Sequence, residues 1–177
     1  MGYTGLRAGG ATDGGLGGVL RVDLRDVQKG PVHTVGNVPP DDPVFEGLEL
    51  EFAGPVDVNG QLQKTGTGEY LWRGQLHAVM HGECRRCLTD VERPIDIDVH
   101  AAVFSSDPEA LEEPDFYPIP ERATHIDLGE VVREELALAA QMQLLLCRED
   151  CAGLCPKCGA DLNAGPCRCH PPSDRTA

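Results

Sequence analysis

Eight cysteines carry the clearest chemical signal in this chain of 177 residues. One pair lies near the middle, in the motif Cys84-Arg85-Arg86-Cys87. The other cysteines crowd into the last third of the chain, at Cys147, Cys151, Cys155, Cys158, Cys167 and Cys169. Two cysteines separated by two residues direct both thiolates at one tetrahedral ion, and sets of four cysteines are typical of structural zinc sites. The spacing therefore predicts zinc as the cofactor.

The eight sulfurs can be divided between two sites in more than one way. The first division makes a compact ribbon-like site near the C-terminus, because a turn at residues 163–166 folds the chain back between its cysteine pairs. Its two sets are Cys155, Cys158, Cys167, Cys169 and Cys84, Cys87, Cys147, Cys151. The second division lets the pair at residues 84 and 87 face the pair at residues 155 and 158. His170 is an alternative ligand to Cys169, and the sequence does not choose among these arrangements.

A site filled by four cysteines favours structure over catalysis. Four sulfurs complete a tetrahedron and leave no position for water or substrate. An iron–sulfur cluster is less consistent with the spacing, which lacks the usual cluster-binding runs. A thiol exchanger is a further alternative, because Arg85 and Arg86 would lower the pKa of a neighbouring thiol, although such a motif normally starts a helix after a strand.

The net charge and the expected cellular compartment limit the kinds of partner that this chain can bind. The formal net charge is −14, so the surface repels phosphate and broad nucleic-acid binding is not expected. Arg85 and Arg86 either neutralise the nearby thiolates and acids or contact RNA or an acidic partner, and Lys157 is a further candidate contact. The first residues lack a secretion signal and no apolar run is long enough to span a membrane. We therefore expect a cytoplasmic protein, where reducing conditions favour zinc over disulfides.

Short apolar runs broken by turn residues predict a sheet in the first part of the chain. The expected strands are residues 20–24, 48–58, 61–67, 70–84 and 91–104. Asn59-Gly60 is the best signal for a tight hairpin, because both residues tolerate positive φ. The connections are too short for crossover helices, so we expect an antiparallel meander, with a barrel-like closure as one option. Cys84 and Cys87 would then occupy the turn between the last two strands.

One helix is expected after the sheet. Asp127 is a good N-cap, Glu130 follows it three residues later as in a capping box, and apolar residues recur at helical spacing from Leu128 to Ala139. The helix should end near Gln141 and pack on the sheet through its apolar stripe. Residues 105–120, rich in proline and acids, are expected to form a solvated loop.

The fold class predicted from these elements is α+β, with a mainly antiparallel sheet, one packed helix and a zinc-ribbon-like segment at the C-terminal end. We expect the chain to be divided into four regions. Residues 1–18 form a disordered glycine-rich tail, residues 19–146 a β-rich domain, residues 147–170 a cysteine-rich metal-binding segment and residues 171–177 a second disordered tail.

The chain from about residue 19 to residue 169 resembles the bacterial YceD family. The resemblance is carried by Cys84-Arg85-Arg86-Cys87-Leu88, the acidic loop, the capped helix at residues 127–136 and the ending at residues 146–163. It implies a role in the accumulation of large-subunit (23S) ribosomal RNA, and hence in ribosome biogenesis. Many relatives have a proline where this chain has residues 139–142, and others lack the cysteine-rich ending.

The resemblance implies a non-enzymatic factor that binds pre-ribosomal RNA or a ribosomal protein through a zinc-stabilised platform. The partners expected are large-subunit ribosomal RNA or ribosomal proteins, with no membrane and no small-molecule substrate. The alternative function is a redox-active thiol protein or a metal-dependent enzyme that processes nucleic acid. The lack of an open metal position and of spaced carboxylates argues against a nuclease.

Overall fold

The computed structural model describes residues 18–48, 50–107, 116–142 and 145–169, and all structural statements below concern these residues. The tails expected at residues 1–18 and 171–177 lie outside them, apart from Gly18. The elements in chain order are β1 (Arg21–Asp23), α1 (Leu24–Val27), β2 (Val32–Val38), the 3-10 turn η1 (Pro43–Phe45), β3 (Glu51–Phe52), β4 (Val56–Gly66), β5 (Glu69–Glu83), β6 (Asp90–Ser105), β7 (Phe116–Pro118), β8 (His125–Asp127) and α2 (Gly129–Met142).

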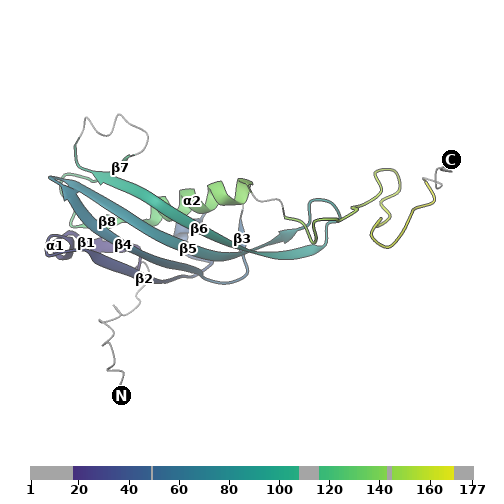
Figure 1. Ribbon diagram of the computed structural model, residues 1–177, viewed down its shortest axis with the longest axis horizontal. Coiled ribbons are helices and arrows are strands. Elements are labelled where there is room, and N and C mark those ends of the chain that lie inside the picture. Colours follow the sequence, from purple (N-terminus) through teal and green to yellow (C-terminus); the bar gives the residue numbers. More distant parts are fainter. Residues whose placement is uncertain (1–17, 49, 108–115, 143–144, 170–177) are drawn as a thin grey trace, which may run out of the picture.

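The main sheet has six strands in the order β2-β4-β5-β6-β7, with β3 also paired to β5. Its long strands β4, β5 and β6 form a curved antiparallel meander (Figure 1). Only β7 pairs in parallel among the described strands, along the end of β6, and β1 and β8 form a separate ribbon. The prediction of a mainly antiparallel sheet is confirmed. Barrel-like closure is wrong for the described residues, because β2 and β7 lie at opposite edges and do not pair.

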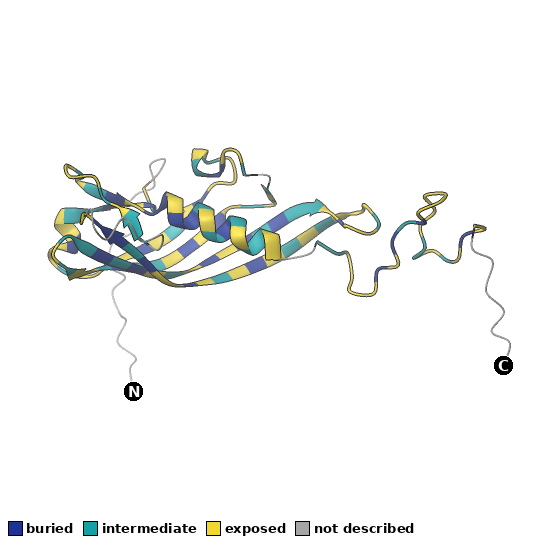
Figure 2. Ribbon diagram, turned by 90° about the horizontal axis from the view of Figure 1, so that it is seen from above, coloured by how far each residue is buried: buried dark blue, intermediate teal, exposed yellow. Residues whose placement is uncertain are grey.

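The core lies between one face of the sheet and helix α2 (Figure 2). Alternate side chains of the long strands point into it, as the two-residue period of a strand requires. On β5 these are Tyr70, Trp72, Leu76, Ala78 and Met80. The predicted apolar stripe of α2 is confirmed, since Val131, Val132 and Leu136 are buried, as is Leu128 immediately before the helix. The N-terminal cap is also confirmed, with the Gly129 backbone N–H donating to Asp127 Oδ1 at 2.9 Å.

The hairpin expected at Asn59-Gly60 is wrong. Strand β4 continues through both residues, and the chain turns instead at residues 67–68, where Gly68 has φ +74°. Gly60 lies directly opposite Gly74, and a Cβ on either glycine would lie 2.7 Å from the indole ring of Trp72. Gly60 is therefore needed for close packing inside a strand, and this requirement overrides its local preference for a turn.

Other boundaries differ from the sequence-based expectation. The strand expected at residues 48–58 is split into β3 and the start of β4, and residues 61–67 belong to β4 rather than to a separate strand. The strand expected at residues 20–24 ends where α1 begins. Strand β2 and the short helix α1 were not expected. Their short or polar sequences carry little periodic signal of their own.

The loop expected at residues 105–120 contains strand β7, so that prediction is wrong at residues 116–118. Residues 108–115 lie outside the described part of the chain. The Tyr117 ring packs against Phe104 with centroids 5.3 Å apart, and its hydroxyl donates to Glu134 on α2 at 2.7 Å. Contacts with distant parts of the chain therefore stabilise a strand inside an acidic, proline-rich sequence.

The β5–β6 hairpin projects beyond the end of α2, and the segment from residue 145 to residue 169, here called the arm, extends from the hairpin tip (Figure 1). As predicted, Cys84 and Cys87 lie in the turn between these two strands. Among the described residues, we find no helix whose length and apolar content would allow it to cross a membrane.

Candidate metal centres

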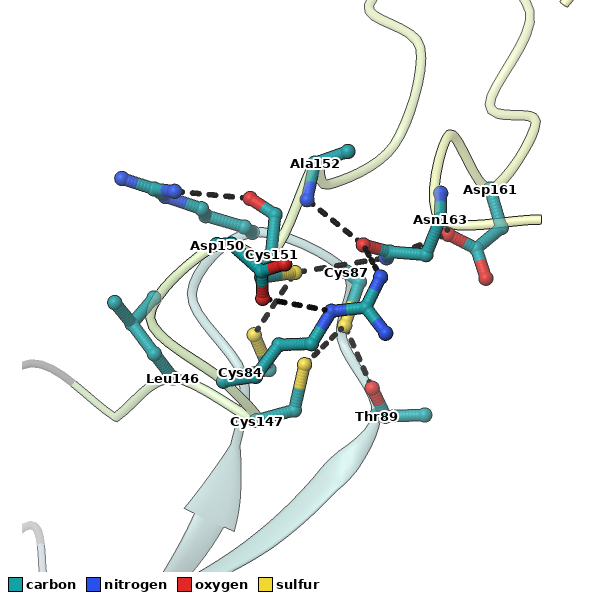
Figure 3. Close-up of polar contacts among 12 residues, drawn as sticks. Cys84, Cys87, Thr89, Leu146, Cys147, Asp150, Cys151, Ala152, Asp161 and Asn163 are labelled. Carbon is teal, nitrogen blue, oxygen red and sulfur yellow. Dashed lines mark hydrogen bonds and ion pairs between the residues drawn. The ribbon is translucent and has the colours of Figure 1, made fainter. Parts of the chain in front are cut away.

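The eight cysteine sulfurs gather in two groups, and within each group the four Sγ atoms lie within 4.8 Å of one another. The first centre consists of Cys84, Cys87, Cys147 and Cys151, and the second centre of Cys155, Cys158, Cys167 and Cys169. Figure 3 shows the sulfurs of the first centre facing one another. This grouping matches the first division considered from the sequence and differs from the second. His170 lies outside the described residues.

The spacing of the sulfurs fits a tetrahedral metal. In the first centre, Cys84 Sγ lies 3.9 Å from Cys151 Sγ, and Cys87 Sγ lies 3.5 Å from Cys147 Sγ. A zinc ion with Zn–S bonds of about 2.3 Å separates its sulfurs by about 3.8 Å. The four thiols can therefore surround a zinc ion with little rearrangement.

The hairpin tip forms a tight turn around the first cysteine pair. The Cys84 backbone N–H donates to the Thr89 carbonyl at 2.8 Å, and the Leu88 N–H donates to the Cys84 carbonyl at 2.9 Å. Leu88 has φ 60°, in the left-handed region. Because this turn joins two strands and starts no helix, it lacks the context of a thiol-exchange motif.

The second cysteine pair forms the same turn. The Cys155 N–H donates to the Ala160 carbonyl at 2.8 Å, and the Gly159 N–H donates to the Cys155 carbonyl at 2.9 Å. Backbone N–H groups of Lys157 and Cys158 point at the Cys155 sulfur and lower its pKa to about 6. A turn that aims N–H groups at a sulfur favours the thiolate, which is the form that binds metal.

Two thiols of the first centre have pKa values shifted in opposite directions. Burial raises the pKa of Cys84, but backbone N–H groups of Cys147, Arg86 and Cys87 outweigh it and lower the pKa to about 6. Hydrogen bonds with the sulfurs of Cys151 and Cys87 raise the pKa of Cys147 to about 12. Without a cation, the four sulfurs cannot all be thiolates at neutral pH. A bound divalent ion would supply the missing positive charge.

Contacts outside the sulfurs attach the arm to the hairpin. The Arg85 backbone N–H donates to the Leu145 carbonyl at 2.9 Å, and Arg93 on β6 donates through Nη2 to the Leu146 carbonyl at 2.8 Å. These bonds bring the chain that follows α2 alongside the hairpin tip. Cys147 and Cys151 thereby reach Cys84 and Cys87, which are about sixty residues away in sequence.

Arg86 connects the first centre to the beginning of the second. Its Nη1 donates to the Cys151 carbonyl at 2.9 Å, and its own carbonyl accepts from the Leu154 N–H at 2.9 Å. Gly153 has φ +75°, and a Cβ there would lie 2.8 Å from the Arg86 carbonyl oxygen. Leu162 N–H donates back to the Gly153 carbonyl at 2.9 Å. Gly153 is thus required both for its conformation and for this close approach.

The three candidate contact residues have different surroundings. Arg85 is exposed at the hairpin tip and Lys157 is exposed on the second turn. The Arg86 side chain is occupied by its bond to Cys151, which agrees with a structural use of this arginine. The geometry brings Arg85 and Arg86 to the first centre and Lys157 to the second.

Sequence reasoning missed three residues that support the centres. Thr89 Oγ1 lies 2.6 Å from Cys87 Sγ, and this hydrogen bond lowers the pKa of Cys87. Gly153 allows the approach to Arg86, and Asn163 donates through Nδ2 to Cys151 Sγ at 3.5 Å. The sequence marks Asn163 as part of a turn, but no local pattern links it to a cysteine twelve residues earlier.

Comparison with known proteins finds one matching protein family and several similar proteins. A family model described as "Large ribosomal RNA subunit accumulation protein YceD" matches residues 72–176, a span that begins in β5 and includes all eight cysteines. Uncharacterized proteins of Mycobacterium tuberculosis and Mycobacterium bovis are 29% identical over 134 residues, covering 72% of this chain and 63% of theirs. The match thus spans less than two thirds of these relatives. No solved structure matches the chain.

Proposed function

Because this chain belongs to the YceD family of large ribosomal RNA subunit accumulation proteins, we propose that it is a non-enzymatic ribosome biogenesis factor. In this proposal it supports accumulation of large-subunit ribosomal RNA through a rigid platform at the hairpin tip. Family membership supports the link to the ribosome. The observations that carry the platform are the first four-sulfur centre, which joins the arm to the β5–β6 hairpin, and the second, which lies within the arm.

Zinc is the proposed metal, and all eight cysteines are its proposed ligands. Thiolate ligands in a tetrahedral set select zinc among the common divalent ions of cells. Four sulfurs would complete the coordination of each ion, which supports a structural rather than a catalytic metal. The free energy of metal binding then becomes free energy of folding for the arm.

The proposed contact surface for RNA lies on the two cysteine turns. Arg85 and Leu88 are exposed on the hairpin turn, and Lys157 is exposed on the second turn. The first centre would fix the hairpin turn against the start of the arm, and the second centre would fix the turn that carries Lys157. These side chains would then be held in place before a partner binds. Preorganisation of this kind lowers the entropy lost when a partner binds.

Charge favours a basic ribosomal protein over RNA as the main partner. The net charge is −14 before metal binding. Each zinc ion held by four thiolates adds about two further negative charges. Long-range attraction to phosphate is therefore unfavourable, whereas a basic protein is attracted, and this attraction should weaken as salt rises. We propose that the acidic surface of the chain holds a basic protein of the large subunit, while Arg85 and Lys157 on the two turns contact the ribosomal RNA that is assembled with it.

Crosslinking in cells followed by capture of the tagged full chain tests this function. We expect large-subunit ribosomal proteins to be enriched over small-subunit proteins, with ribosomal RNA recovered alongside them. Recovery of ribosomal RNA should fall for R85A combined with K157A and stay unchanged for R73A, a matched control at an exposed arginine within β5. Equal recovery of both subunits, or recovery of neither, would contradict the proposal. Recovery of RNA without protein would show that RNA is the direct partner.

A further inference from the structure

Asn163 contacts the chain segments of both metal centres, and we propose that it couples them, so that the two metal ions are bound and released together. The inference rests on the proposed zinc binding but goes beyond it. Two structural ions at separate sites would serve a platform equally well without any coupling. The coupling assigns Asn163 a positioning role that the cysteines alone do not provide.

The Asn163 side chain makes three hydrogen bonds to the segment of the first centre. Its Nδ2 donates to Cys151 Sγ at 3.5 Å. Its Oδ1 accepts from the Ala152 backbone N–H and from Arg148 Nη2, each at 2.7 Å. Figure 3 shows the Asn163 amide directed at Cys151 and Ala152. Side-chain donors to a metal-binding thiolate orient it and stabilise its charge.

The same residue belongs to the segment of the second centre. Asn163 lies between Cys158 and Cys167, inside the loop that a metal at the second centre would close. Within that loop its backbone N–H and its Nδ2 donate to Asp161 Oδ1 at 2.9 and 2.7 Å. Asp161 in turn forms a β-bridge with Leu154, the residue before Cys155. The position of Asn163 therefore depends on the folded loop of the second centre.

Coupling follows from this shared dependence. A metal at the second centre closes the loop and holds Asn163 in place, so less ordering is needed when Asn163 bonds to the first centre. A metal at the first centre orders residues 147–152, which then receive the Asn163 side chain. A coupling free energy between two binding sites is necessarily reciprocal. Each ion should thus strengthen the binding of the other by reducing the ordering that remains.

The experiment removes zinc from the full, metal-loaded chain with increasing amounts of a chelator and counts bound ions by native mass spectrometry. For the natural sequence, we expect molecules with two ions and with none to dominate at half removal, with few carrying one. For N163A, the one-ion form should rise to about half of all molecules or more, because independent sites give about half when their affinities are equal and more when one site is weaker. Loss of an outer-shell partner should also weaken the first centre about 10- to 100-fold. N59A, at an exposed asparagine in β4, is the matched control and should behave like the natural sequence.

Two further measurements keep the inference falsifiable. If N163A cannot be purified with metal, R148A keeps Asn163 but removes one bond to its Oδ1 and should raise the one-ion form partway. Equal one-ion populations in the natural sequence and in N163A, or in R148A where N163A cannot be purified with metal, would overturn the coupling. A reduced, purified protein without any zinc would overturn both the coupling and the zinc platform. Independent loading together with intact capture of ribosomal proteins would overturn the coupling alone.

Discussion

Leu88 and Gly159 occupy the same position in the two cysteine turns, directly after the second cysteine of each pair. Their φ angles are 60° and 71°, and both backbone N–H groups donate to the carbonyl of the first cysteine at 2.9 Å. Glycine adopts this left-handed conformation freely, whereas another residue is disfavoured by about 1–2 kcal/mol. The Leu88 side chain is 58% exposed, so burial offsets little of this strain. The turn around the cysteines imposes the conformation on whichever residue follows.

This relationship predicts opposite responses to exchanging the two residues. G159L should lower the stability of the second turn by about 1–2 kcal/mol, because leucine resists positive φ. L88G should be tolerated within about 1 kcal/mol, since relief of strain offsets the added freedom of the unfolded chain. Chelator concentration at half removal of zinc measures both effects. A larger loss of metal from L88G than from G159L would contradict the shared geometry.

Removing one ligand from each centre should affect different parts of the molecule. With zinc in excess, C84S should reduce zinc to one more weakly held ion per chain and release the arm from the hairpin, because the first centre joins segments about sixty residues apart. C158S should also leave one more weakly held ion, but it should disturb mainly the outer part of the arm. Metal analysis combined with hydrogen exchange of residues 145–151 distinguishes the two variants. Equal protection of that segment in both would count against the predicted role of the first centre.

The pKa shifts predict how the metal-free, reduced chain responds to pH. Backbone N–H groups hold the pKa of Cys84, despite its burial, and that of Cys155 at about 6, below the ordinary 9.0. A depressed pKa adds stability that is complete above the unfolded value and lost as pH falls to the folded one. Hydrogen exchange in the arm should therefore speed up from pH 9 to pH 6, after correction for intrinsic rates. The zinc-loaded chain is the control and should change less, and an arm equally protected at both pH values would contradict the shifts.

The packing of Trp72 predicts which glycines of the sheet are essential. A Cβ at Gly60 would lie 2.7 Å from the indole ring and 2.7 Å from the Arg73 carbonyl oxygen. G60A should lower the free energy of unfolding by about 1–3 kcal/mol through overpacking. At Gly54 no atom lies within 4 Å of an added Cβ, so G54A serves as the control and should be nearly neutral. Chemical denaturation of both variants checks this, and equal losses would refute the packing argument.

Local signals in the sequence predicted the parts of the fold that short segments determine. The cysteine pairs predicted both tight turns, and Asp127 with the spaced apolar residues predicted α2 and its cap. Asn59-Gly60 misled because its preference for a turn is local, whereas the approach of Trp72 depends on a neighbouring strand. Strand β7 was missed because three residues of parallel pairing carry no periodic pattern.

The candidate site was predictable to the same extent. Once two compact turns were expected, counting the remaining cysteines suggested which sulfurs would meet. The contacts of Arg86 and Asn163 were not predictable, because they form only after the arm docks on the hairpin. Arg86 illustrates the limit, since its charge suggested a partner contact while its position directs it to the Cys151 carbonyl.

The most direct test of the account is the ratio of large-subunit to small-subunit ribosomal RNA in cells that depend on variants of this chain. We expect depletion to lower the ratio, the natural sequence and N59A to restore it, and a variant with Cys84 and Cys158 both replaced by serine to fail while it is still produced. That result would tie RNA accumulation to the metal-held arm. A normal ratio in depleted cells would contradict the role in ribosome biogenesis, and full rescue by the double cysteine variant would contradict the zinc platform.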